Sequence, residues 1–298
     1  MAMLKAPVLI YSHGEDDLDS FMRYFRGRLG TRIFLNHSQN FLKTGYAAVL
    51  EFEKLGTRAQ KKFLKRICDF DYLLAGSELE KRFLERAFSH KKPVILPRVG
   101  AAHLDTLKRD SLMKLEHTTF LWFPTFRDGD GGKTLLKMVG EVVSSKELLE
   151  YLEATDSRFV VVPHVNSRMN LLSFSPFVKI LQPSEIGELL ATANCFISDY
   201  SGTIIDWLLL ERPFIHFMFD YEAYTKRRSF YMDPFKLNFG KVCTSAGELV
   251  QEIVSENWRH MALYEASREA FKKEAFPDLS YGFSERCYNA ILELVRHE

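Results

Sequence analysis

Short apolar runs alternate with segments of helical spacing along the whole chain. Apolar runs at residues 6–13, 31–38, 70–77 and 93–100 are typical of buried strands, and the segments between them place apolar residues three and four positions apart. The same alternation continues after residue 117. Repeated strand–helix units predict parallel sheets that are covered by helices on both faces, so the pattern indicates an α/β fold. The later runs lie at 117–128, 158–166, 177–182 and 212–220, with one more beginning at Cys195.

The strand–helix pattern restarts near residue 110, which predicts two sheets in two domains. We expect the first domain to span residues 1–112 and the second residues 113–298, with helices from about Ser245 almost to the end. Ser77 followed by Glu80 matches a capping box and predicts a helix start between the third and fourth strands.

Composition narrows the class of protein. The chain has 298 residues, 46% of them hydrophobic, and 40 basic residues offset 39 acidic ones, so no overall charge favours nucleic acid. The four cysteines are far apart, which suits a reducing compartment and excludes a zinc ribbon. The sequence has no signal-peptide pattern and no apolar run of membrane-spanning length. We therefore expect a cytoplasmic protein, either free or peripheral on the inner face of the plasma membrane.

Polar residues follow several of the predicted strands directly. In open α/β sheets, ligands bind beyond the carboxyl ends of the strands, so these positions are the candidates for a site. They are His13, residues 36–38, Arg127 with Asp128, residues 164–166 and residues 199–201.

The segment 199–203 precedes a strongly apolar helix and has two interpretations. Ser201 suits a simple helix cap, because a serine oxygen accepts an otherwise unpaired backbone N–H. Alternatively, the turn binds phosphate: free N–H groups at a helix start attract anions, Gly202 permits close approach, and Ser201 and Thr203 add hydroxyl donors. Asp199 would repel a bare phosphate, so we expect it to orient the loop or a hydroxyl.

Several segments together resemble one known family. The residues 198–201 (SDYS), Asp206, Arg212–Pro213 and 220–224 (DYEAY) match the spacing of the CDP-glycerol glycerophosphotransferases, which build teichoic-acid and capsule polymers. The resemblance covers roughly residues 33–250. Further matches lie at 121–130 (LWFPTFRDGD), 160–166 (VVVPHVN), 227–234 (RRSFYMDP) and, more loosely, 35–45 (LNHSQNFLKTG), where Ser38–Gln39–Asn40 replace the family's Gly-Thr-Pro.

The resemblance implies a fold and a reaction. It implies the GT-B architecture of two Rossmann-type domains with a cleft between them, the first for the acceptor and the second for the nucleotide. It further implies transfer of a polyol phosphate, glycerol phosphate first, from a CDP-linked donor to a hydroxyl of a cell-surface polymer or lipid-linked primer, with release of CMP. The implied partners are a CDP-polyol donor, a polyol-phosphate or glycan acceptor and a membrane surface. No metal, cofactor or nucleic acid is implied.

The resemblance also implies roles for individual residues. His37 matches the family's first histidine and is the predicted general base, since an imidazole can be neutral at working pH. His164 matches the second histidine and is predicted to hydrogen-bond the diphosphate or the leaving group. The remaining predicted substrate-binding residues are Arg127, Asp199, Ser201, Gly202 and Thr203, with Arg127 and the turn holding phosphate oxygens and Asp199 structural or ribose-orienting.

Alternatives stay open at this point. A nucleotide-sugar glycosyltransferase of the same fold, acting on a capsule or lipopolysaccharide-type acceptor, would use similar residues, as would a binding protein without turnover.

Other polar residues have structural interpretations. His216 lies inside an apolar run and is predicted to be a core histidine, and Asp206 needs a buried partner. The basic segment 57–66 is either a solvated helix face or a contact for anionic lipid. The polar stretch 128–133 (DGDGGK) is predicted to be a loop.

Overall fold

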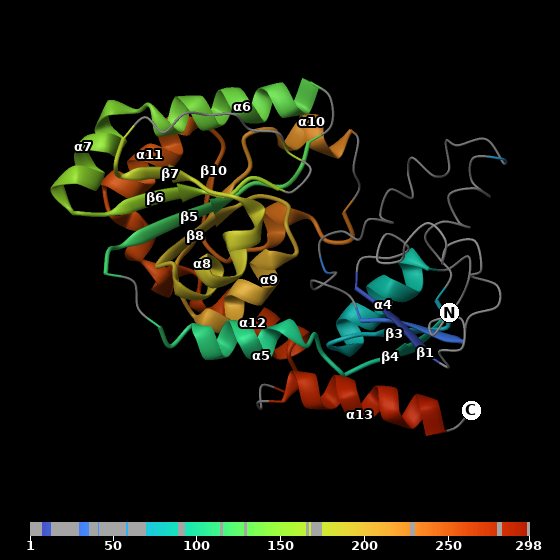
Figure 1. Cartoon of the computed structure of the whole chain (residues 1–298). Helices are drawn as coiled ribbons and strands as arrows, with labels where there is room; N and C mark the ends of the chain where they lie inside the picture. Colours follow the sequence, from blue (N-terminus) through green and yellow to red (C-terminus); the bar gives the residue numbers. More distant parts are fainter. Residues whose placement is uncertain are drawn as a thin grey trace. The chain divides into compact units, whose positions relative to one another are not determined.

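The computed structural model divides the chain into two compact units (Figure 1). Unit 1 comprises Met1–Thr106 and Lys272–Glu298, and unit 2 comprises Leu107–Phe271. Each unit contains one parallel sheet, as the sequence predicts. The structure describes residues 8–12, 30–35, 41, 58, 70–88, 93–113, 116–127, 130–164, 167, 175–226, 230–278 and 282–296.

Unit 1 contains a four-stranded parallel sheet in the order β1-β2-β3-β4, formed by Val8–Tyr11, Thr31–Phe34, Tyr72–Leu74 and Val94–Leu96. These strands lie within the first four predicted runs. Between β3 and β4, helix α4 (Glu78–Ala87) begins where the capping box predicts: Ser77 Oγ accepts the N–H of Glu80 at 3.1 Å. The Glu80 carboxylate in turn accepts the N–H of Gly76 at 2.7 Å. The sequence also predicts helices at 17–30 and from about 47 to 66, between the first three strands; these segments lie outside the described residues, except Gly30 and Arg58.

The last helix, α13 (Phe283–Arg296), packs on the sheet of unit 1 through Cys287, which shares a core with Ile33, Leu74 and Val99. Gly100 makes this contact possible. Its φ of 86° lies in the left-handed region, and a Cβ atom there would come 2.5 Å from the ring of Phe283. The sequence predicts that residues 272–298 belong to the second domain, whereas the structure groups them with unit 1.

The Asp105 carboxylate fixes the start of α13. This residue belongs to α5 (His103–Asp110), and its side chain accepts the backbone N–H groups of Gly282, Phe283 and Ser284 at 3.2, 3.1 and 2.7 Å. An aspartate at a helix start both satisfies unpaired donors and suits the positive end of the helix dipole.

Unit 2 contains a six-stranded parallel sheet in the order β10-β9-β8-β5-β6-β7. The chain runs outward from β5 to β6 and β7, then returns to the other side of β5 for β8, β9 and β10. The strand order therefore reverses between the neighbours β5 and β8, and such a switch point is where open α/β sheets bind ligands. The strands are β5 (Thr119–Phe123), β6 (Arg158–Val161), β7 (Val178–Ile180), β8 (Cys195–Ser198), β9 (Phe214–Phe217) and β10 (Lys241–Cys243).

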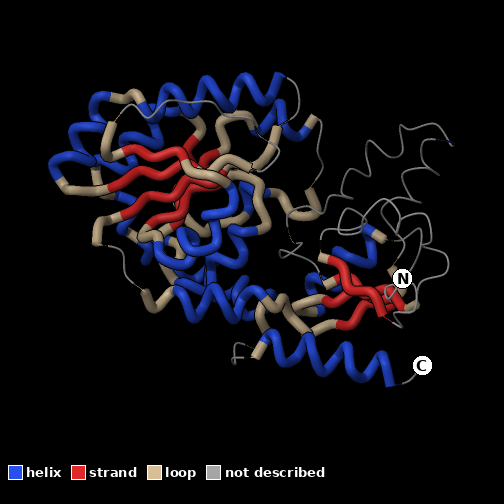
Figure 2. The backbone as a smooth tube through the Cα atoms, viewed as in Figure 1, coloured by secondary structure: helices blue, strands red, loops and turns tan. Residues whose placement is uncertain are grey.

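Helices cover both faces of this sheet (Figures 1 and 2). On one face, α6 (Asp130–Val143), α7 (Lys146–Ala154) and α11 (Ala246–Val254) pack on alternate strand residues such as Phe120 and Trp122. On the other face, α9 (Thr203–Trp207) packs Trp207 against Phe196 of β8, with ring centroids 5.1 Å apart. Because both faces are covered, the central strands are almost wholly apolar, which explains their continuous hydrophobic runs. The described part of the chain also contains the helices α8 (Ile186–Thr192), α10 (Tyr221–Thr225) and α12 (Glu265–Ala275).

Two local predictions were wrong. The stretch 128–133 was predicted to be a loop, but α6 already begins at Asp130, so both Gly131 and Gly132 are helical. The edge strand β10 was missed, since its three residues are too few for a clear pattern. Among the described helices, none combines the length and apolar character that crossing a membrane would need.

Candidate functional site

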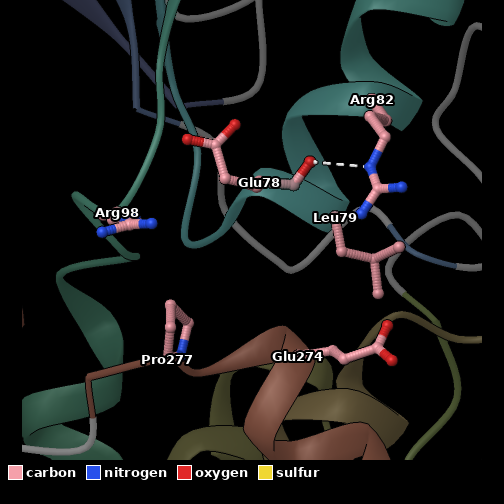
Figure 3. Close-up of a pocket in the computed structure, with 6 residues that line it drawn as sticks. All are labelled: Glu78, Leu79, Arg82, Arg98, Glu274 and Pro277. Atoms are coloured by element: carbon pink, nitrogen blue, oxygen red, sulfur yellow. Dashed lines mark hydrogen bonds between the residues drawn. The ribbon is translucent and has the colours of Figure 1, made fainter.

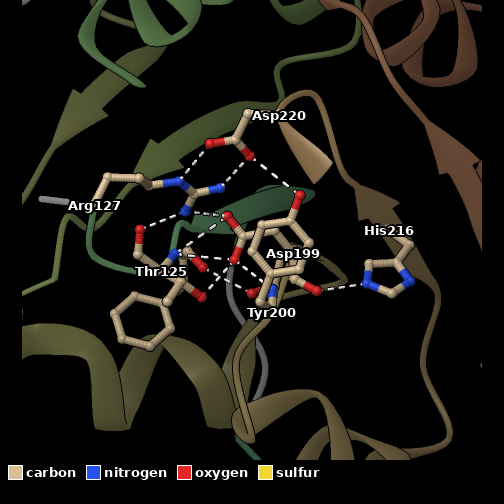
Figure 4. Close-up of polar contacts among 8 residues, drawn as sticks. Thr125, Arg127, Asp199, Tyr200, His216 and Asp220 are labelled. Atoms are coloured by element: carbon tan, nitrogen blue, oxygen red, sulfur yellow. Dashed lines mark hydrogen bonds and ion pairs between the residues drawn. The ribbon is translucent and has the colours of Figure 1, made fainter. Parts of the chain in front are cut away.

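Three loops meet at the carboxyl edge of the sheet in unit 2, following β5, β8 and β9. They carry the sequence segments PTFRD, SDYSGT and DYEAY, which are far apart in the chain. Figure 4 shows their side chains joined by one set of hydrogen bonds and ion pairs. The loops after β5 and β8 flank the switch point, so this polar cluster lies where the topology predicts a ligand site.

Arg127, from the loop after β5, is the centre of the cluster. Its Nη1 atom lies 2.6 Å from Asp199 Oδ2, while its Nε and Nη2 atoms donate to the two carboxylate oxygens of Asp220 at 3.0 and 2.8 Å. The guanidinium also lies 5.1–5.2 Å from the ring centroids of Tyr200, Phe219 and Tyr224. Only 3% of the side chain is exposed. Burial alone would lower the pKa of Arg127, but the two carboxylates raise it above its ordinary value, so the charge is permanent.

Asp199, from the loop after β8, is completely buried and fully hydrogen-bonded. Besides Arg127, its carboxylate accepts the hydroxyl of Thr125 at 2.5 Å, the N–H of Thr125 at 3.0 Å and the N–H of Tyr200 at 2.5 Å. Burial alone would raise the pKa of Asp199, but the charge of Arg127 and these donors lower it. Asp199 therefore stays ionised and holds the loops after β5 and β8 together. Its predicted part in substrate binding stays a prediction.

Asp220 and Tyr200 extend the cluster to the loop after β9. The Tyr200 hydroxyl donates to Asp220 at 3.1 Å, and its ring stacks on Tyr224 with centroids 4.1 Å apart. Burial raises the pKa of Tyr200, and the negative charges of Asp220 and Asp199 raise it further, so the phenol stays protonated. The tyrosine thus holds two of the loops together through both a hydrogen bond and a ring contact.

The turn at residues 201–203 follows this cluster directly and is partly exposed. Ser201 Oγ accepts the N–H of Thr203 at 3.3 Å and donates to the Thr203 hydroxyl oxygen at 3.0 Å. The serine is therefore engaged in local hydrogen bonds with Thr203, while the residue that caps α9 is Gly202. Among the described residues, no acceptor is found for the hydroxyl hydrogen of Thr203, which leaves that group as a donor for a ligand.

The predicted histidines have different outcomes. His164 follows β6 and is partly exposed, with its ring centroid 5.8 Å from that of Phe126 in the loop after β5, so it lies at the same sheet edge. His37 lies outside the described residues, and its predicted role as base stays a prediction. His216 is completely buried in β9, which confirms the prediction of a core histidine. Its Nε2 atom donates to the Asp199 carbonyl oxygen at 2.5 Å, and burial lowers its pKa to about 4, so it is neutral at physiological pH.

The structure changes the interpretation of Arg127. The sequence predicted that it holds phosphate oxygens, but its guanidinium is directed at two buried carboxylates and at the Thr125 carbonyl oxygen, 2.5 Å away. It acts on the site by fixing the loops, and direct phosphate contact stays a prediction. Asp206 is buried in α9, as an internal helix position predicts.

Three members of the cluster, Thr125, Tyr200 and Asp220, are not among the site residues predicted from the sequence. All three stand inside the segments that resemble the family, but the sequence gives no role for them. Only the strand order shows that these segments meet. Among the described residues, no group of three or more His, Cys, Asp or Glu side chains is placed to hold a metal ion.

The two sheets and the loop cluster at the switch point define a GT-B-like α/β protein. A sequence profile of the family CDP-Glycerol:Poly(glycerophosphate) glycerophosphotransferase matches residues 1–293. The chain therefore belongs to this family of enzymes, which confirms the resemblance seen in the sequence.

Curated relatives lie within teichoic-acid synthesis. The chain is 23% identical over 201 residues to the teichoic acid glycerol-phosphate primase of Bacillus subtilis (strain 168), covering 65% of this chain and 51% of the relative. It is 28% identical over 177 residues to the teichoic acid poly(ribitol-phosphate) polymerase of Bacillus spizizenii, covering 58% of this chain and 27% of the relative. The chain thus spans about half or less of the length of these relatives.

Solved structures support the fold. The wall teichoic acid polymerase TagF, in a variant soaked with CDPG, superposes with a TM-score of 0.74 at 16% identity, covering 98% of this chain and 72% of that one. S. aureus MnaA with UDP gives a TM-score of 0.54 at 12% identity, covering 97% and 76%. At these identities the likeness concerns the fold alone.

Proposed function

We propose that the chain transfers a polyol phosphate, glycerol phosphate first, from a CDP-linked donor to a hydroxyl of a cell-surface polymer or lipid-linked primer, releasing CMP. Family membership supports the reaction class. The observation that carries the location is the Arg127–Asp199 ion pair, which joins the loops after β5 and β8 at the switch point and places the partly exposed turn 201–203 beside it. The protein would work in the cytoplasm or on the inner face of the plasma membrane.

The turn at residues 201–203 supplies hydrogen-bond donors for the diphosphate of the CDP-linked substrate. The Thr203 hydroxyl has a hydrogen to give, and the turn itself is held by the buried cluster rather than by the ligand. Preorganised donors lose little entropy when the substrate binds and stabilise charge that grows on the departing phosphate. Asp199 does not repel the diphosphate as an unpaired carboxylate would, because Arg127 offsets its charge.

The chemical step forms one bond and breaks one. The acceptor hydroxyl oxygen bonds to the phosphorus that carries the glycerol, while the bond from that phosphorus to the bridging oxygen breaks and CMP departs with the electron pair. The hydroxyl proton passes to a base, for which His37 is the predicted residue. His164, at the same sheet edge as Phe126, is predicted to donate a hydrogen bond to the diphosphate or the departing CMP.

A panel of donors tests this proposal. The protein is incubated with CDP-glycerol, CDP-ribitol, UDP-sugars or CMP-sugars together with a polyol-phosphate primer, and nucleotide release and products are measured. CMP release with a new phosphodiester from a CDP-polyol supports the proposal. A glycosidic product from a nucleotide sugar would instead show a glycosyltransferase acting on a capsule or lipopolysaccharide-type acceptor, and binding without any turnover would show a binding protein.

A further inference from the structure

A pocket of about 370 Å³ lies within unit 1 (Figure 3). It is formed by residues that follow β3 and β4, together with the end of α12 where the chain has re-entered unit 1. The carboxyl ends of parallel strands are the usual place for ligands in such sheets. The lining residues are Glu78, Leu79, Arg82, Arg98, Glu274 and Pro277.

Two guanidinium groups are available in this pocket. Arg98 is exposed, and among the described residues its side chain makes no hydrogen bond or ion pair. Arg82 donates only a long bond of 3.4 Å, from Nε to the Glu78 carbonyl oxygen. The backbone of Arg98 has a φ of 64°, a left-handed conformation that side-chain-bearing residues rarely adopt. The fold therefore holds an unpaired cation at the pocket in an uncommon conformation.

At the start of α4, Ser77 Oγ accepts the N–H of Glu80 and the Glu80 carboxylate accepts the N–H of Gly76, so the protein itself uses these two donors. The cationic side chains that line the pocket are Arg82 and Arg98. Guanidinium groups suit phosphate oxygens because their N–H groups form a planar fork.

Two carboxylates line the same pocket, which restricts the kind of anion. Glu78 and Glu274 are both exposed and would repel a ligand made of phosphates alone. They can, however, accept hydrogen bonds from hydroxyl groups. A ligand that alternates phosphodiesters with hydroxyl-bearing carbons satisfies both kinds of side chain at once.

We propose that this pocket is a subsite for the polyol-phosphate chain of the acceptor, with Arg82 and Arg98 binding phosphodiester oxygens and Glu78 and Glu274 binding polyol hydroxyls. The inference rests on the proposed function, because the reaction needs a second substrate besides the donor. The donor is assigned to unit 2, and this pocket provides a separate site of matching chemistry in unit 1.

The direct test measures binding of a labelled, short poly(glycerol phosphate) oligomer to the full chain without any donor. Arg82→Gln and Arg98→Gln should each weaken binding about tenfold, since each removes a charge-assisted contact. Arg296→Gln, which removes an exposed charge from α13 of the same unit, should bind as the wild type does. Wild-type affinity in both pocket variants, or no binding by the wild-type protein, would overturn the subsite.

A second comparison tests the role of the carboxylates. Glu274→Gln should weaken binding of poly(glycerol phosphate) but strengthen binding of inorganic polyphosphate, which has phosphates and no carbon-bound hydroxyls. Stronger binding of both polymers would contradict hydroxyl recognition. Neither binding assay needs turnover, so together with the measurement of CMP release they separate the two proposals. Binding that depends on Arg82 and Arg98, without CMP release, would refute only the phosphotransfer. CMP release, with binding that does not depend on these arginines, would refute only the subsite.

Discussion

The Nη1 atom of Arg127 lies 2.6 Å from the Oδ2 atom of Asp199, and the two side chains are 3% and 0% exposed. The two residues are 72 positions apart, yet they follow neighbouring strands of one sheet. Their ion pair joins the loops after β5 and β8 at the switch point of the sheet. It thereby fixes the loop that carries the candidate hydrogen-bond donors at residues 201–203. Stability and function are therefore expected to depend on the same contact.

Replacing Arg127 should destabilise unit 2 strongly. In Arg127→Met, the carboxylates of Asp199 and Asp220 lose their common cation while they stay buried, and breaking a buried pair in this way costs about 3–5 kcal/mol. Chemical denaturation measures the free energy of unfolding. Arg109→Gln is the matched control, because its pair with Asp110 lies at the surface and should contribute nothing measurable. Equal stability of the two variants would contradict a structural role for Arg127.

Replacing the Tyr200 hydroxyl should have a smaller effect. Tyr200→Phe removes the hydrogen bond to Asp220 and keeps the ring stacked on Tyr224, so we expect a loss of about 1 kcal/mol in the free energy of unfolding. Asp220 keeps its two bonds from Arg127, which limits the cost. Tyr200→Leu, which also removes the ring contacts, should lose clearly more. Equal losses of unfolding free energy in Tyr200→Phe and Tyr200→Leu would contradict a contribution from the ring contacts.

His216 should make the protein less stable in mild acid. Burial lowers its pKa to about 4, whereas an unfolded histidine titrates near 6.5, so between these pH values the unfolded chain binds the proton and the folded chain does not. The free energy of unfolding should therefore fall as pH falls through this window, by about 1.4 kcal/mol per pH unit from this residue.

Denaturation curves at pH 7 and pH 5 measure this effect of His216. His216→Gln keeps a donor for the Asp199 carbonyl oxygen but cannot titrate, so its stability should fall less than that of the wild type. The same pH dependence in both proteins would show that His216 is not held neutral by burial.

Much of the fold follows from the sequence alone, because parallel strands that are buried on both faces must be continuous apolar runs. Phe120, Leu121 and Trp122 are each completely buried, and such runs predicted nine of the ten strands found among the described residues. The short edge strand β10 lacks this signal. The assignment of α13 to unit 1 depends on the contact of Gly100 with Phe283, and no local pattern predicts so distant a contact.

The candidate site was predictable in location but only partly in chemistry. Polar residues after strands indicated the sheet edge at which the structure brings Asp199 and Arg127 together, after β8 and β5. The sequence could not show that Arg127 is enclosed by Asp199 and Asp220. That arrangement depends on which strands are neighbours, and periodicity does not encode strand order.

Gly100 should not tolerate a side chain. In Gly100→Ala, the new methyl group meets the buried Phe283 ring at 2.5 Å, and the φ of 86° disfavours alanine, so we expect a loss of about 1–3 kcal/mol in the free energy of unfolding. Gly140→Ala is the control: it lies inside α6 with no atom within 4 Å of the new methyl group, and alanine favours a helix by about 1 kcal/mol. The thermal midpoint should fall in Gly100→Ala and rise in Gly140→Ala. Shifts of the same sign in the two variants would contradict the close approach of Gly100 to α13.

His164 should matter for turnover and little for folding. If it donates a hydrogen bond to the diphosphate or the departing CMP, His164→Ala should lower kcat about 10²–10³-fold, since the donor is lost where charge develops. His260→Ala, at an exposed position in the same unit, should leave kcat unchanged. Rates of CMP release from CDP-glycerol measure both. An unchanged kcat in His164→Ala would remove this residue from the site.

The central claim is that the carboxyl edge of the six-stranded sheet binds the diphosphate of a CDP-linked donor at residues 201–203. A crystal structure of the full chain with CDP-glycerol tests it most directly. We predict diphosphate oxygens within hydrogen-bonding distance of the Thr203 hydroxyl. The Arg127–Asp199 ion pair should stay intact in this complex. A nucleotide bound elsewhere on the chain, with residues 201–203 in contact only with protein, would contradict the account.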